Sequence, residues 1–167
     1  MVAAMMSSVD PLQFSNIDAT IYGADVNWNF SLSDNLKLSG IASYVRGKRE
    51  DTKDNLYRQT PLNTRVNLFY HQGNWQSNLS LHAYAKQKHV SILNNETATP
   101  GYSLIDWQAD YFVTSGLMIK LGINNLLNKQ YASHLGGVNR AKGSEISVGQ
   151  RISGMGRNIY FALDYQF

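Results

Sequence analysis

The chain has 167 residues and no cysteine, and its 15 basic and 12 acidic side chains give a formal charge of +3 at pH 7. Only 16% of the residues are charged while 11% are aromatic, whereas an ordinary soluble domain has roughly 25% charged residues. This composition argues against a typical cytosolic enzyme. Without cysteine the chain has no disulfide, thiol nucleophile or cysteine-based zinc site. Because the basic residues form no run along the chain, we expect no nucleic-acid partner.

Hydrophobic residues alternate with polar ones through most of the chain, which predicts β-strands with two different faces. No apolar stretch is long enough for a membrane-spanning helix. In chain order, the seven expected strands span residues 17–30, 36–44, 62–71, 75–86, 105–113, 117–124 and 158–167. The first alternates less regularly than the others, and we expect a change of phase, with a bulge, near Gly23.

The connections between the expected strands alternate between short and long. The short ones are residues 33–35, 72–74 and 114–116, and the long ones are roughly 47–60, 89–101 and 128–156. An up-and-down meander places all short turns at one end and all long loops at the other. The pattern therefore predicts an all-β fold, an antiparallel up-and-down transmembrane β-barrel segment of about seven strands from a larger barrel. A soluble β-sandwich or lipocalin-like barrel also alternates in this way and stays open as an alternative.

Aromatic residues near the expected strand ends favour the membrane alternative, because they are typical of an interfacial girdle. These residues are Trp28, Tyr44, Tyr70, Trp75, Tyr102, Tyr111, Tyr131, Tyr160 and Tyr165. The faces opposite the apolar ones carry charges and amides, as a water-filled lumen requires. In the strand of residues 117–124 this alternation assigns Leu121 to the lipid side and Gly122 to the lumen.

Three stretches, residues 16–25, 121–131 and 156–167, together resemble the C-terminal part of a TonB-dependent outer-membrane receptor. The most specific is the second, whose motif residues are Asn124, Asn125, Leu126, Asn128 and Tyr131. The resemblance covers residues 15–167, which it assigns to the C-terminal part of a receptor barrel. Residues 1–14 have no counterpart and form an N-terminal segment of uncertain structure.

The resemblance implies an active transporter in the outer membrane of a Gram-negative bacterium. Its cargo is expected to be a metal chelate, first of all a ferric siderophore, and its energy to come through TonB. Such receptors close a barrel of 22 strands around a plug, so the chain is expected to be a fragment without the plug or the TonB-contact segment. The alternatives are a receptor for another metal such as copper, or an independent small β-barrel that acts as a binding protein or adhesin.

The implied partners are outer-membrane lipid and lipopolysaccharide, the barrel-assembly machinery, the metal-chelate ligand, and TonB through the N-terminal part that the fragment lacks. The last strand resembles the signal that the assembly machinery reads. The residues of this expected signal are Ile159, Phe161, Leu163, Tyr165 and Phe167.

The connection of residues 131–157 is the main candidate for ligand contact, because it carries several basic residues and a single acidic one, Glu145. The candidate ligand-binding residues are His134, Arg140, Arg151 and Arg157. A basic loop above a pore would attract an anionic chelate. One histidine without neighbouring ligand residues makes no metal site, and no catalytic constellation is visible. We therefore expect neither an enzyme, a resident metal nor a cofactor.

Overall fold

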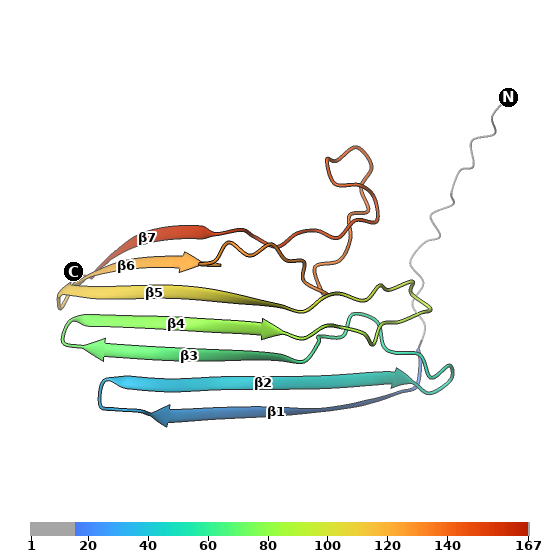
Figure 1. Ribbon diagram of the computed structural model, residues 1–167, viewed down its shortest axis with the longest axis horizontal. Helices are drawn as coiled ribbons and strands as arrows, with labels where there is room; N and C mark the ends of the chain where they lie inside the picture. The colour runs from blue at the N-terminus through green and yellow to red at the C-terminus, as the bar shows by residue number, and fades with distance from the viewer. Residues whose placement is uncertain (1–15, 167) are drawn as a thin grey trace.

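Seven antiparallel strands in sequence order make up a single sheet in the computed structural model, which describes residues 16–166 (Figure 1). The strands are β1 (Ala19–Ser31), β2 (Leu36–Arg49), β3 (Asn63–Gln72), β4 (Trp75–Tyr84), β5 (Tyr102–Thr114), β6 (Leu117–Asn124) and β7 (Asn158–Tyr165). The expected N-terminal segment 1–14 and the terminal Phe167 lie outside the described residues. The predicted all-β meander is confirmed.

The pairing of β1 with β2 is continuous, from Ala19 opposite Arg49 to Ser31 opposite Lys37. The predicted change of phase near Gly23 is therefore wrong. Tyr22, Ala24 and Phe30 lie on one face of β1 without interruption, and Ile21 lies on the other face. An irregularity occurs instead in β5, where the register with β6 shifts between Phe112 and Thr114.

The register gives the sheet one apolar and one polar face. On the apolar face, one row of directly paired residues runs across six strands through Leu38, Leu68, Leu79, Trp107, Ile123 and Ile159. On the polar face, the neighbouring row consists of Ser39, Asn67, Ser80 and Asp106. Because successive residues of a strand point to opposite sides, this division follows directly from the alternation in the sequence.

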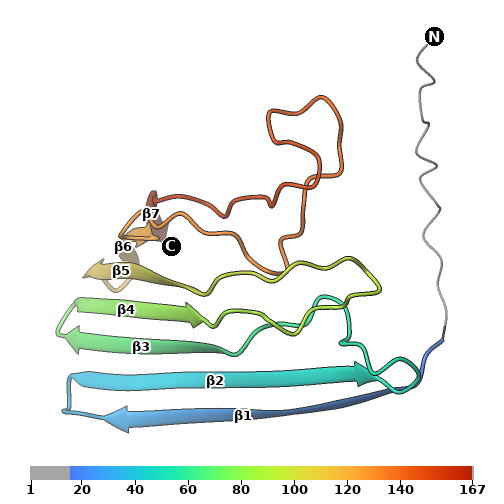
Figure 2. The ribbon, with the colours of Figure 1, turned by 45° about the vertical axis from the view of Figure 1, so that its right-hand side comes forward.

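No second layer covers the apolar face in the part of the chain that the structure describes (Figure 2). Among those residues, Ala109 is the only buried hydrophobic one, and apolar side chains on β1, β4 and β7 are widely exposed. A domain needs two packed layers to bury an apolar face in water, and a patch of this extent marks contact with lipid or protein. Residues 16–166 contain no helix that could cross a membrane.

The polar face carries some of the aromatic residues that the sequence assigned to the girdle. The Tyr160 ring lies directly over Gly122, where an added Cβ would stand 2.1 Å from the ring, and its hydroxyl donates to Gln108 Oε1 at 3.1 Å. Tyr102 and Tyr131 also pack together on this side, with ring centroids 4.7 Å apart. The girdle assignment is therefore wrong for these three tyrosines. A position near the end of a strand does not determine on which face of the sheet a side chain lies. Gly122 lies on the polar face, as predicted.

Short turns lie at one end of the sheet and long loops at the other, as predicted (Figure 1). We call residues 50–62 the first, 85–101 the second and 125–157 the third long loop. The three loops are neighbours in space, because each of them connects strands at the same end of the sheet.

Candidate functional site

The first and second long loops are joined by Asp54. Its carboxylate accepts hydrogen bonds from the Ser91 hydroxyl at 2.9 Å and from the backbone N–H groups of Ile92 at 3.1 Å and Leu93 at 3.0 Å. The two backbone bonds lower the pKa of Asp54 to about 2. The turn at residues 91–95 is thus held against the first loop by a carboxylate that stays charged at all ordinary pH values.

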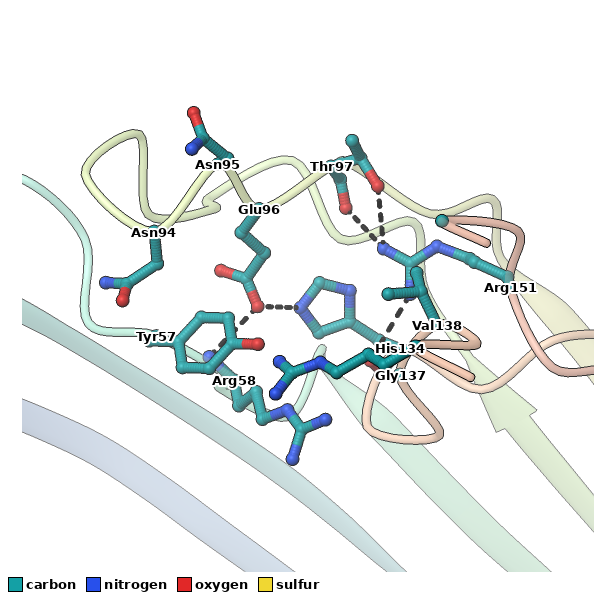
Figure 3. Close-up of a pocket in the computed structure, with 12 residues that line it drawn as sticks. Tyr57, Arg58, Asn94, Asn95, Glu96, Thr97, His134, Gly137, Val138 and Arg151 are labelled. Atoms are coloured by element: carbon teal, nitrogen blue, oxygen red, sulfur yellow. Dashed lines mark hydrogen bonds and ion pairs between the residues drawn. The ribbon is translucent and has the colours of Figure 1, made fainter. Parts of the chain in front are cut away.

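Glu96 contacts all three long loops with one carboxylate (Figure 3). Its Oε1 accepts a hydrogen bond from the backbone N–H of Arg58 in the first loop at 3.0 Å. Its Oε2 accepts one from the backbone N–H of Ser91 in its own loop at 2.8 Å. The third loop contributes His134, whose Nε2 lies 3.0 Å from Glu96 Oε1.

The His134 ring is buried between the second and third loops, with only 1% of its side chain exposed. Its Nδ1 lies 3.1 Å from the hydroxyl of Thr99. We assign the neutral tautomer in which Nδ1 accepts from Thr99 and Nε2 carries the proton. Nε2 faces Glu96 but forms no hydrogen bond with a described residue. Burial lowers the pKa of His134, and the positive charges of Arg151 and Arg58 lower it further, against the opposing effect of Glu96. The ring is therefore neutral at pH 7.

Arg151 makes a second connection between the third and second loops. Its Nη2 donates to the carbonyl oxygen of Thr97 at 2.7 Å and to the Thr97 hydroxyl at 3.0 Å, while Nη1 donates to the carbonyl oxygen of His134 at 3.4 Å. Carbonyl groups are neutral acceptors, so the guanidinium keeps its full positive charge at this position.

The three loops enclose a cavity of about 240 Å³. It is lined by Tyr57, Arg58, Asn94, Asn95, Glu96, Thr97, His134, Gly137, Val138, Arg140, Gly149 and Arg151. Three guanidinium groups thus border the cavity with a single carboxylate, which already accepts two backbone hydrogen bonds and lies 3.0 Å from His134 Nε2. The cavity has the charge and the donors for an anionic group, and its volume matches part of a drug-sized ligand.

Arg58 and Arg140 differ from Arg151 because their guanidinium groups form no hydrogen bond with another described residue, whereas that of Arg151 forms three. Within residues 16–166 neither guanidinium forms an ion pair with a carboxylate. The Arg58 guanidinium carbon lies 5.5 Å from the ring centroid of Tyr57, which holds the side chain over an aromatic face. Removing solvent from these two groups would favour pairing with an incoming anion.

The structure brings together three of the four ligand-binding candidates: His134, Arg140 and Arg151 border the same cavity. Both ring nitrogens of His134 face protein groups, so its role there is to hold the loops. Arg157 does not line the cavity, and its backbone N–H donates to Asn128 Oδ1 at 3.0 Å near the start of β7. In the described part of the chain no group of three or more His, Asp or Glu residues could hold a metal ion.

Sequence reasoning missed Glu96, Arg58 and Asp54, which come from the other two loops. The one available signal was that the three long loops were expected at the same end of the sheet. It predicts that the loops meet, but not which side chains meet.

The asparagine-rich motif that carried the family resemblance holds the base of the third loop. Asn125 is buried, its amide nitrogen donates to the carbonyl oxygens of Lys129 at 2.9 Å and Met155 at 3.2 Å, and its Oδ1 accepts from the backbone N–H of Lys129 at 2.8 Å. Asn125 and Asn128 both have a φ of 50°, a conformation that asparagine tolerates well. The motif therefore ties both ends of the loop together.

The remaining motif residues connect this base to the sheet. Asn124 is the last residue of β6 and pairs with Asn158 of β7. The backbone N–H of Leu126 donates to the carbonyl oxygen of Ile105 at 2.7 Å. The backbone N–H of Asn125 donates to Asp106 Oδ1 at 2.7 Å, and Tyr131 packs against Tyr102.

The expected assembly signal lies on the apolar face of β7, at the edge of the described sheet. Ile159, Phe161, Leu163 and Tyr165 are between 60% and 68% exposed. They pair with apolar residues of β6 on one side only. β7 therefore presents an apolar outer face and is the last strand of the described sheet.

Comparison with known proteins gives a family match and several structural matches. The family model of the β-barrel of TonB-dependent receptor-like proteins matches residues 3–126. A search of curated proteins by sequence gives no significant match.

Solved structures share the arrangement of the strands. The structure described as the copper transporter OprC superposes with a TM-score of 0.84 at 24% identity, over 92% of this chain and 25% of that one. The ferripyoverdine receptor of the outer membrane of Pseudomonas aeruginosa gives 0.65 at 15% identity, over 90% and 20%. The ferric yersiniabactin uptake receptor FyuA from Yersinia pestis gives 0.65 at 14% identity, over 89% and 24%.

These matches explain both faces of the sheet. The chain spans about a quarter of the length of the first matched structure, so its open sheet corresponds to part of a barrel wall. Such barrels lie in the outer membrane of Gram-negative bacteria, with lipid against the apolar face and the lumen against the polar face. The chain belongs to the TonB-dependent receptor family, and its seven strands are a segment of the receptor's β-barrel.

Proposed function

We propose that the chain is part of an outer-membrane active transporter that takes up a metal chelate, with a ferric siderophore as the first candidate. The observation that carries this proposal is the cavity between the three long loops, where Arg58 and Arg140 have no carboxylate partner among the described residues. A chelator that surrounds Fe³⁺ with deprotonated oxygen donors carries net negative charge. Arginine guanidinium groups recognise such oxygen anions by charge and by paired hydrogen bonds.

Within this proposal the chain supplies wall strands and extracellular loops rather than the energy coupling. In this family the plug and the contact with TonB belong to other parts of a receptor. Because the chain spans about a quarter of the length of the first matched structure, we assign transport to the complete receptor. The long loops would contribute one side of its ligand site on the cell surface.

Copper is the second candidate cargo, for two reasons. The structure described as a copper transporter superposes with a TM-score of 0.84. In addition, Met155 in the third loop is 70% exposed, and thioether sulfur is a ligand that Cu(I) prefers. A bare copper ion needs soft ligands rather than guanidinium groups, so the two candidates depend on different residues.

Uptake by cells that express the complete receptor tests this proposal. With radioactive iron bound to an anionic chelator, we expect uptake that requires both the receptor and TonB, and no competition from copper. Copper-specific binding with loss on Met155→Ala would replace the siderophore by copper as cargo. Binding of neither ligand, or uptake without TonB, would contradict the proposal.

We further propose that the outer face of β7 is recognised by the barrel-assembly machinery, because its apolar side chains are widely exposed. Removing Phe167 from the complete receptor should reduce the amount of receptor in the outer membrane. A matched deletion that shortens the exposed third loop by one residue, Gly143, is the control. Normal outer-membrane levels without Phe167 would contradict the assembly role.

A further inference from the structure

The contacts of Glu96 distinguish it from the cationic residues of the cavity. All three groups that face its carboxylate, the backbone N–H of Arg58, the backbone N–H of Ser91 and the Nε2 of His134, approach within 2.8–3.0 Å. The two backbone groups donate hydrogen bonds to the carboxylate, whereas His134 Nε2 makes a close polar contact with Oε1 without forming a hydrogen bond. A carboxylate accepts at both oxygens, whereas the isosteric amide of glutamine would turn an N–H against one of these donors.

We propose that Glu96 is the positioning residue of the ligand cavity, that it latches the three long loops together through Arg58, Ser91 and His134, and that protonation of His134 opens this latch. The inference deepens the proposed function, since it concerns regulation of the same cavity, and in that respect it rests on that proposal. The latch itself is a property of the loops without ligand, so it can be measured independently of ligand uptake.

The position of Glu96 shows why losing it affects loops that are far apart in sequence. The Glu96 side chain is only 5% exposed and lies between the first and third loops. Arg58 adopts a φ of 57°, an uncommon conformation for a residue with a side chain, and its backbone N–H is held by Glu96. Without the carboxylate, the backbone N–H groups of Arg58 and Ser91 would lose their acceptor at once in a partly dry site, which costs more than losing one bond in water. His134 would lose its close contact with Oε1 as well.

The charges around His134 give the latch its pH dependence. The second loop presents Glu96 and Thr99, the third loop presents Arg151, and the first loop presents Arg58. A protonated ring would place a further positive charge in a buried site that already has two guanidinium groups nearby. Burial and these cations outweigh the attraction of Glu96, so the pKa of His134 is lowered in the closed loops.

The sign of the effect follows from linkage. When the loops are open, His134 titrates near its ordinary value of 6.5, whereas in the closed loops it takes up a proton only at lower pH. Between these two values the open form binds more protons, so acidification favours opening. The ratio of closed to open loops then falls by up to about tenfold for each pH unit.

Hydrogen exchange of the complete receptor without ligand, followed by mass spectrometry at pH 7.5 and pH 5.5, tests the latch. After correction for the intrinsic pH dependence of exchange, we expect protection of residues 50–62, 91–99 and 131–154 to decrease at pH 5.5. His134→Gln keeps an N–H donor for Glu96 but does not titrate, so its protection should be the same at both pH values. His71→Gln, on β3 in the sheet, is the matched control and should leave the pH dependence unchanged.

Glu96→Gln provides the second arm. It should remove protection from the first and third loops at both pH values, although it changes neither size nor shape of the side chain. Glu145→Gln removes a carboxylate from the exposed part of the third loop and should change nothing. Protected loops in Glu96→Gln, or a persistent pH dependence in His134→Gln, would overturn the proposal. The hydrogen-exchange experiment uses the receptor without ligand. Its result can therefore be interpreted even if the uptake experiment fails.

Discussion

The sheet and the long-loop cluster are stabilised in different ways. The sheet rests on backbone pairing that continues from β1 to β7, and each side chain matters mainly through the face on which it lies. The loops lack such pairing over most of their length and depend on a few polar side chains, above all Asp54, Glu96 and Arg151. The effect of a substitution in the sheet should therefore depend on the face on which the side chain lies, whereas the effect of one in the loops should depend on individual contacts.

The largest expected effect tests the facing rule of the sheet. Leu121 lies on the apolar face between Ala109 and Phe161, so Leu121→Arg in the complete receptor should destabilise the barrel by about 2–4 kcal/mol near the middle of the membrane. Ser39→Arg places the same side chain on the polar face and should cost clearly less. Unfolding in denaturant, in a lipid environment, measures both.

Equal costs at the two positions would show that the faces are wrongly assigned. Gly122→Arg, although adjacent to Leu121, is unsuitable as the control. Its side chain would collide with the ring of Tyr160, as the 2.1 Å approach of an added Cβ shows. It would be destabilising for a steric reason, whichever face met the lipid.

A smaller effect is expected at the base of the third loop. Asn125→Ala removes two donors and one acceptor that hold Lys129 and Met155, and it leaves alanine at a φ of 50°. We expect a loss of about 1–3 kcal/mol, the usual cost of stranding buried polar groups. Asn124→Ala is the matched control, since the exposed neighbouring asparagine has no such set of contacts.

Thermal unfolding of the two variants compares these costs. If Asn125→Ala were no less stable than Asn124→Ala, the motif would not serve as the tie that closes the loop. A selective rise in hydrogen exchange at residues 125–131 and 155–157 would instead place the damage where the contacts predict it.

The smallest expected effect is a local one at Asp54. Asp54→Ala should speed hydrogen exchange at Ile92 and Leu93, whose N–H groups it binds, and leave the sheet unchanged. The pKa of Asp54 is lowered to about 2 from its ordinary value of 3.8. The charged carboxylate therefore stabilises the turn fully above pH 3.8, and this stabilisation is lost as the pH falls toward 2. The carboxylate of Asp54 stays charged near pH 5.5, so loosening of this turn at that pH in the wild type does not come from Asp54. Under the proposed latch it should disappear in a His134→Gln receptor, and its persistence there would contradict the latch.

The strands were largely predictable from sequence because alternation reports facing directly. Leu117–Asn124 was predicted with the observed bounds, whereas β2 continues to Arg49, beyond the predicted end at residue 44. Residues 46–49 are three basic residues and a glycine, so their pairing with β1 leaves no hydrophobic signal. The supposed bulge at Gly23 arose in the same way, from reading a weak apolar pattern without the register of the partner strand.

The candidate site was only partly predictable, because its contacts join residues that are distant in the chain. His134, Arg140 and Arg151 were selected for their charge in one loop. Glu96 is 38 residues from Arg58 in sequence, and no local pattern marks either as a partner of the other. Arg157 was grouped with the others by sequence proximity, but the motif at Asn128 holds its backbone outside the cavity.

If the cavity binds the ligand, the affinity of the complete receptor for an anionic ferric chelate should depend on Arg58 and Arg140. The double variant Arg58→Gln/Arg140→Gln should bind at least about tenfold more weakly, which corresponds to about 1.4 kcal/mol. Arg157→Gln removes a charge from the same loop outside the cavity and should bind as the wild type does. Unchanged affinity of the double variant, or an equal loss in Arg157→Gln, would contradict the claim that this cavity recognises the ligand.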